Sequence, residues 1–241
     1  MVDTVKGMAL YERYRPQSEA ELVGGGRQTA GRAARLLERR GQAVCLITGP
    51  SGAGKSTLAG ILASRLATHE LDRITVNIGT SRGLDFIREI EDSIRYAAHG
   101  DGWKVYVLEE AHSLTTAAQT ALLNVLEHYP QRRAVILTSS EEGVFTEAFR
   151  SRCLPIRLPK LTSADICELV ERTAQCEGLA LTLADRDQIV READGNARTA
   201  LNLLEWYADE APVWAARKPS GAVKPAAIPD AQPRLEFELA N

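Results

Sequence analysis

Short apolar runs alternate with longer amphipathic stretches over the first two thirds of the chain. The runs predict buried strands, and the stretches between them have the apolar spacing of helices. The predicted strands are 43–48, 73–78, 104–108, 134–138 and 154–158, and the predicted helices are 55–67, 84–98 and 115–127. Alternation of strands and helices favours a parallel sheet covered on both faces. The sequence therefore predicts an α/β fold with a parallel five-stranded sheet.

The pattern becomes purely helical after Pro159. Thr162-Ser163-Ala164-Asp165 has the sequence of a capping box, and Gly178 follows the expected end of that helix. Two more helices are expected at about 184–193 and 196–209. This region therefore predicts a small three-helix domain.

The last 30 or so residues differ again, because Pro212–Asn241 contains five prolines, many alanines and few bulky side chains. Such a composition favours an extended, mobile tail. The predicted organisation is an α/β domain over 1–160, a helical domain over 161–210 and a flexible tail over 211–241.

Composition narrows the class of protein. The 241 residues are 44% hydrophobic and 25% charged, which is ordinary for a globular protein, and the net charge of −3 gives no global attraction to nucleic acid. The four cysteines have no metal-binding spacing, and no apolar stretch is long enough to span a bilayer. Since the first residues also lack a secretion signal, we expect a cytoplasmic protein without membrane contact.

One segment carries a clear chemical signal. Gly49-Pro50-Ser51-Gly52-Ala53-Gly54-Lys55-Ser56 matches the phosphate-binding pattern G-x-x-x-x-G-K-[ST] between a predicted strand and a predicted helix. Such a loop turns backbone N–H groups inward and directs a helix N-terminus at the phosphates. Lys55 is expected to reach the β- and γ-phosphates, and the Ser56 hydroxyl is expected to bind Mg²⁺. The chain is therefore predicted to bind a nucleoside triphosphate.

Two carboxylates follow the strand 104–108. At such a strand end in a P-loop protein, the first carboxylate holds the Mg²⁺ shell and the second orients the attacking water. Glu109 and Glu110 are expected in these roles, with Glu109 acting partly through water. The alternative is a pair of solvated glutamates. Most P-loop ATPases have aspartate at the first position, so the longer Glu109 leaves the hydrolysis rate open.

Three further residues are weaker candidates. Ser140 follows the strand 134–138, where a hydroxyl would reach the γ-phosphate or the water if this strand lies beside that of Glu109. Arg198 lies in the first turn of the last helix, where the helix dipole disfavours a cation unless an anion is near. Arg152 precedes the last strand and, taken alone, is a surface arginine.

In their order along the chain, these motifs resemble those of AAA+ ATPase subunits of sliding-clamp loaders, the bacterial DNA polymerase III gamma/tau type first and replication factor C small subunits next. The resemblance covers residues 9–208. The segments that carry it are Tyr11-Glu12-Arg13-Tyr14-Arg15-Pro16, Leu22-Val23-Gly24, Gly83–Ile90, Lys104–His112, Ala118–Glu127, Ser151-Arg152-Cys153 and Gly195–Leu204.

The resemblance implies a P-loop AAA+ domain followed by a lid, with ATP bound between them. It implies that Ser140 senses the γ-phosphate, that Arg198 reports it to the lid, and that Arg152 acts in trans on ATP held by a neighbouring subunit. Lys55 and Glu110 complete the implied catalytic set. The implied nucleotide contacts are Gly49, Pro50, Ser51, Gly52, Ala53, Gly54, Lys55, Ser56, Thr57, Tyr11, Arg15, Val23 and Arg198.

The sequence departs from the family pattern in three respects. Glu109 replaces the usual aspartate, and the cysteine cluster of the gamma/tau zinc module is absent. The segment after the lid is too short and too poor in apolar residues to form the collar domain that closes the pentamer, so we expect a subunit without a collar.

Two peripheral features are weaker candidates for partner binding. Arg88 and Arg95 lie on a segment that contacts DNA in clamp loaders, although interleaved acidic residues are equally consistent with a solvated helix face. In the tail, Gln232, Leu235 and Phe237 are similar to the Q-x-x-L-x-F peptide that docks on sliding clamps; an incidental apolar pair is the alternative.

The sequence thus predicts an ATPase subunit that uses ATP and Mg²⁺ at inter-subunit sites to load a sliding clamp on primer–template DNA. The expected partners are other loader subunits in a pentameric assembly, the clamp and the DNA. Two alternatives stay open. One is a nucleotide-dependent switch or adaptor with little hydrolysis, and the other is a different AAA+ remodeller such as a helicase loader.

Overall fold

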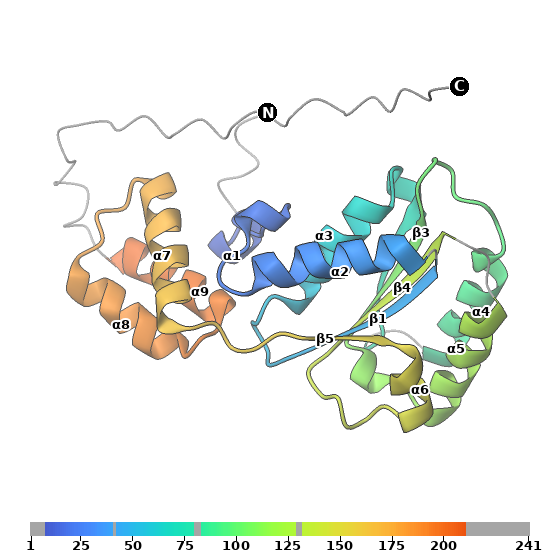
Figure 1. Ribbon diagram of the computed structural model, residues 1–241. Coiled ribbons are helices and arrows are strands. Elements are labelled where there is room, and N and C mark those ends of the chain that lie inside the picture. Colours follow the sequence, from blue (N-terminus) through green and yellow to red (C-terminus); the bar gives the residue numbers. More distant parts are fainter. Residues whose placement is uncertain (1–7, 41, 80–82, 129–131, 211–241) are drawn as a thin grey trace, which may run out of the picture.

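The computed structural model describes residues 8–40, 42–79, 83–128 and 132–210 (Figure 1). The predicted tail, with Gln232, Leu235 and Phe237, lies outside these residues. None of the described helices is long and apolar enough to cross a membrane.

Five parallel strands form one sheet in the order β2-β3-β4-β1-β5, so the predicted α/β architecture is confirmed. The strands are β1 (Gln42–Thr48), β2 (Arg73–Asn77), β3 (Lys104–Glu109), β4 (Arg133–Ser139) and β5 (Leu154–Arg157). Because all of them run in the same direction, their carboxyl ends lie along one edge of the sheet. The loops after β1, β3 and β4, which carry the sequence motifs, leave from this edge.

Alternating side chains of the central strands supply two apolar layers. On β4, Ala134 and Ile136 enter one layer, and Val135 and Leu137 enter the other. Both faces are covered by helices, as the unbroken apolar runs predict. Helices α2 (Gly26–Arg40) and α3 (Lys55–Leu66) cover the first face, and α4 (Gly83–Ile94), α5 (Thr116–His128) and α6 (Glu147–Arg152) cover the second (Figure 1).

The prediction of a helix over 84–98 was wrong at its end, because α4 stops at Ile94. Two buried cations bind carbonyl groups of its last turn and of Tyr96, just beyond it. Arg133 donates from Nε to Ile94 O at 2.9 Å and from Nη2 to Tyr96 O at 2.7 Å, and Lys104 Nζ donates to Ser93 O at 2.8 Å. These contacts from β3 and β4 satisfy carbonyl groups that a longer helix would have paired internally.

Helix α2 was not predicted from the hydrophobic pattern. Its buried face consists mostly of the small residues Ala30, Ala33 and Ala34, with Leu37 as the large one. The helix is strongly amphipathic, but alanines and five arginines give it few large apolar residues, so it does not stand out as an apolar segment. Short 3₁₀ turns occupy Glu19–Glu21, Glu70–Asp72 and Ala111–Ser113.

The helical region forms a third apolar cluster of its own. It contains α7 (Ser163–Glu177), α8 (Leu183–Ala193) and α9 (Ala197–Glu210), which we call the lid. The predicted capping box is confirmed, since Thr162 Oγ1 accepts from Asp165 N at 3.2 Å and Asp165 Oδ2 accepts from Thr162 N at 2.8 Å. Gly178 ends α7 in the left-handed conformation at φ 67°.

The N-terminal helix α1 (Leu10–Arg13) packs with the lid, far from it in sequence (Figure 1). Leu10 is buried in the lid cluster, and its N–H donates to Glu205 Oε2 at 3.3 Å. Arg13 pairs with Glu177 at 3.3 Å, and the Tyr14 hydroxyl donates to the same carboxylate. The two ends of the described chain therefore share one body.

We predict that Ile136→Ala lowers the free energy of unfolding by about 2–5 kcal/mol, because Ile136 is fully buried in the centre of the sheet and its loss leaves a cavity. Urea denaturation measures this. Leu71→Ala is the matched control, since Leu71 is 63% exposed and its truncation should cost less than about 0.5 kcal/mol. Equal losses in the two variants would contradict the assigned core.

Candidate nucleotide-binding site

The loop between β1 and α3 has a backbone that only glycine adopts easily. Gly52 and Gly54 have φ of 75° and 87°, and Gly49 has φ of 154°. A Cβ on Gly49 would lie 2.3 Å from the carbonyl oxygen of Leu158. Gly54 is the N-cap of α3, so the first free N–H groups of that helix face the loop. The segment therefore has the form of an anion-binding P-loop.

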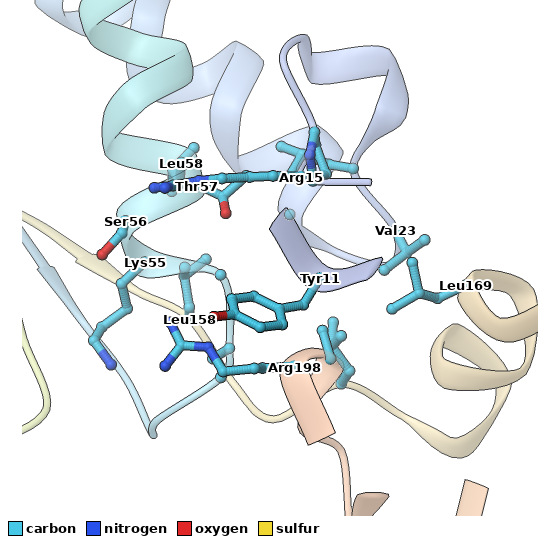
Figure 2. Close-up of a pocket in the computed structure, with 18 of the residues that line it drawn as sticks. Tyr11, Arg15, Val23, Lys55, Ser56, Thr57, Leu58, Leu158, Leu169 and Arg198 are labelled. Carbon is cyan, nitrogen blue, oxygen red and sulfur yellow. The ribbon is translucent and has the colours of Figure 1, made fainter. Parts of the chain in front are cut away.

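A cavity of about 720 Å³ lies between this loop, α1 and the lid (Figure 2). Its apolar wall includes Val23, Leu158 and Leu169, and its polar wall comes from the loop and from the ends of β3 and α9. The predicted site residues that line it are Tyr11, Arg15, Val23, Ser51, Gly52, Ala53, Gly54, Lys55, Ser56, Thr57, Glu109, Glu110 and Arg198. Among the predicted residues, Gly49, Pro50, Ser140 and Arg152 are not part of this lining.

Two hydrogen bonds hold the Lys55 side chain against the P-loop. Its Nζ donates to the carbonyl oxygens of Gly49 and Pro50, each at 2.9 Å. Burial lowers the pKa of Lys55; nearby Glu110 acts in the opposite direction, and the positive charge of Arg198 lowers the pKa further. A phosphate beside Lys55 and Arg198 would offset both the burial and the repulsion between the two cations.

Ser56 and Glu109 provide the oxygen atoms that Mg²⁺ prefers. Both residues line the large cavity and also a second cavity of about 390 Å³ beside it. Within the described ranges, no group of three or more His, Cys, Asp or Glu side chains could hold a metal by itself. A Mg²⁺ ion here would take its remaining ligands from phosphate and water, as this ion usually does. The donor set thus fits a metal–nucleotide complex.

Glu110 has an unusual backbone and a neighbour that the sequence did not single out. It has φ 56° and ψ 39°, a region that costs free energy for any residue with a side chain and that often marks functional sites. His112 Nδ1 lies 3.5 Å from Glu110 Oε2 and 3.4 Å from Ser140 Oγ. Ser140 does not line the cavity. His112 connects the Ser140 hydroxyl to the Glu110 carboxylate, which does line it. No sequence signal marked His112 beyond its place after the paired glutamates.

The lid meets the P-loop directly. Ala197 N donates to Gly52 O at 3.3 Å. The preceding residue, Asn196, caps α9 by accepting from Thr199 N at 3.1 Å, and a Cβ on Gly52 would lie 1.9 Å from Asn196 Oδ1. The missing side chain of Gly52 is therefore what allows the start of α9 to reach the loop. Asn196 was identifiable from sequence only as a helix N-cap.

Comparison with known proteins agrees with this geometry. The family described as "DNA polymerase III, delta subunit" matches residues 69–162. Replication factor C subunit 4 of Encephalitozoon cuniculi is 31% identical over 198 residues, which are 81% of this chain and 63% of that protein. DNA polymerase III subunit tau of Bacillus subtilis is 28% identical over 218 residues, which are 82% of this chain and 39% of that protein.

The chain is a relative of clamp-loader AAA+ ATPase subunits. The family resemblance predicted from the motifs is thus confirmed. The chain spans less than two thirds of the length of the relatives that it matches. A RuvB mutant of Thermotoga maritima shares the fold, with a TM-score of 0.66 and 24% identity over 79% of this chain and 64% of that one.

Arg152 does not line the cavity of its own chain. It lies in the last turn of α6, on the exposed side, and its Nη1 donates to Ala148 O at 3.0 Å. Its action on a neighbouring subunit stays a prediction.

The candidate DNA contacts, Arg88 on α4 and Arg95 directly after it, are exposed but lie among acidic side chains. Arg95 pairs with Glu91 at 3.5 Å, and Arg88 also has an interaction partner. Exposed Glu89 and Asp92 lie on the same helix. A DNA-binding role for Arg88 and Arg95 stays a prediction.

We predict that Gly52→Ala weakens nucleotide binding at least about tenfold, because the added Cβ takes the place of Asn196 Oδ1 and the positive φ strains the loop. Titration with a fluorescent adenine nucleotide measures this. Asn196→Ala in the same chain should recover part of the loss by removing the clash.

Gly60→Ala is the matched control for this prediction, since Gly60 lies on the exposed side of α3 with nothing within 4 Å of an added Cβ. If Gly52→Ala and Gly60→Ala bind nucleotide equally well, the contact between the lid and the P-loop is not needed for binding.

Proposed function

We propose that this chain is a clamp-loader subunit that binds Mg²⁺·ATP between the P-loop and the lid and hydrolyses it at inter-subunit sites. The observation that carries the proposal is the meeting of Lys55, Glu110 and Arg198 in one cavity while Arg152 lies outside it. Ser140 also lies outside the lining but is linked to Glu110 through His112, so the arginine is the element that a neighbouring copy would supply.

The side chains divide the proposed work between them. Lys55 binds the β- and γ-phosphate oxygens, and the P-loop N–H groups surround them. Ser56 and Glu109 would hold Mg²⁺, and the ion would supply positive charge against the negative charge that develops during phosphoryl transfer. Glu110 orients the attacking water. His112, between Glu110 and Ser140, links this carboxylate to the residue proposed to sense the γ-phosphate.

The proposed partners follow from the relatives. We propose assembly with other loader subunits into a pentamer, and function on a sliding clamp and primer–template DNA. The names of the similar proteins, replication factor C and DNA polymerase III subunits, support a place in DNA replication. Their greater length leaves room for assembly elements outside the part that matches.

We predict that Arg152→Ala lowers the rate of ATP hydrolysis by about 10³-fold or more while nucleotide affinity changes little, because an arginine in trans acts on the transition state. Mixing Arg152→Ala chains with Glu110→Gln chains should restore part of the activity, since the second chain supplies Arg152 to the intact site of the first. Steady-state phosphate release measures both effects.

Arg150→Ala is the matched control, because Arg150 is exposed on the same helix two residues away. It should keep the wild-type rate. A mixture that hydrolyses no faster than the two variants alone would contradict a site shared between subunits.

A second candidate function is a nucleotide-dependent switch with little hydrolysis, and Glu109 is the observation that favours it, since its longer side chain alters the position of the metal-binding carboxylate. We predict that Glu110→Gln abolishes turnover but keeps ATP-dependent assembly if the chain is a motor. In a switch, the same substitution changes neither property. Turnover together with light scattering under Mg²⁺·ATP separates the two functions.

A further inference from the structure

The guanidinium group of Arg198 lies over an aromatic ring, that of Tyr11. Its guanidinium carbon lies 5.4 Å from the centroid of the Tyr11 ring. No hydrogen bond or ion pair to another described residue accompanies this contact. Figure 2 shows the Arg198 side chain extending beside Tyr11 toward the side of the cavity where Lys55 lies. The cation thus lies against the Tyr11 ring.

The ring and the cation are carried by the same body. Tyr11 follows Leu10, which is buried in the lid cluster and tied through its N–H to Glu205 of α9 at 3.3 Å. Arg198 lies in the first turn of α9. The backbone segments that carry the ring and the cation are therefore held together by packing inside the lid.

The ring also opposes an electrostatic repulsion. Arg198 and Lys55 are close enough for their positive charges to repel each other. Burial is the main cause of the lowered pKa of Lys55, and the charge of Arg198 lowers it further. A flexible arginine would swing away from a second cation. The face of an aromatic ring attracts a guanidinium without using its N–H groups, so these groups stay available to phosphate oxygens.

We propose that Tyr11 is a positioning residue that holds Arg198 at the phosphate end of the cavity and thereby sets the preference of the site for ATP over ADP. The inference rests on the proposed function, since it concerns the same nucleotide site. A simple contact between Tyr11 and the base makes a different prediction, because ATP and ADP carry the same base and would be affected equally.

The test measures dissociation constants for ADP and for a non-hydrolysable ATP analogue with Mg²⁺, in the full chain. Tyr11→Leu, which keeps apolar bulk but removes the ring, should lower the preference for the ATP analogue by about three- to tenfold. Tyr11→Phe keeps the ring and should hold the preference within about twofold of the wild type. Melting curves check that each variant is folded, and Tyr11→Met replaces Tyr11→Leu if the latter is not.

A double-mutant cycle with Arg198→Ala completes the test. Arg198→Ala should itself lower the preference, and Tyr11→Leu should not change the preference further in that background. Equal weakening of both nucleotides by Tyr11→Leu, or an unchanged effect of Tyr11→Leu without Arg198, would overturn the inference. If the wild-type chain binds neither nucleotide, the proposed function itself fails.

Discussion

The parallel direction of β1, β3 and β4 is the constraint on which the site depends. The three strands are paired in register, so their carboxyl ends lie side by side. The P-loop leaves β1, the paired glutamates end β3, and Ser140 follows β4. Residues separated by up to about ninety positions in the chain therefore meet at one edge of the sheet. An antiparallel neighbour would have placed one of these loops at the opposite edge.

The lid adds Arg198, a second cation in the cavity beside Lys55 of the P-loop. The position of the lid depends on the close approach of α9 to Gly52. Any side chain on residue 52 would prevent this approach. Helix α1 is bound to the same lid, so one body brings both Tyr11 and Arg198 to the cavity. A lid motion would therefore move the ring and the guanidinium together, while Lys55 and Glu110 stay with the sheet.

Strong local signals made much of this structure predictable. The five strands and the Thr162 capping box were found because a buried parallel strand is a short apolar run and a capping box is a fixed spacing of polar residues. The P-loop was found because its pattern is nearly unique. By contrast, α2 has an alanine-rich buried face, and the end of α4 is set by Arg133 and Lys104, which come from distant strands. Sequence periodicity contains no information about contacts between the end of a helix and strands distant in the chain.

The contacts within the site were the least predictable part. The proximity of Asn196 to Gly52, of His112 to Ser140 and of Tyr11 to Arg198 each joins segments that only the folded chain brings together. Sequence reasoning predicts a phosphate near Arg198, because the helix dipole disfavours a cation in a first helical turn unless an anion is near. It could not identify the side chain that holds this cation in place.

Everything proposed for this chain requires that the cavity bind Mg²⁺·ATP through the P-loop. Calorimetric titration of the wild-type chain and of Lys55→Ala with the non-hydrolysable ATP analogue tests it most directly. We expect one nucleotide per chain, tighter binding with Mg²⁺ than with a chelator, and a loss of most of the affinity in Lys55→Ala. Binding that is absent in the wild type, or unchanged by Lys55→Ala, would contradict it.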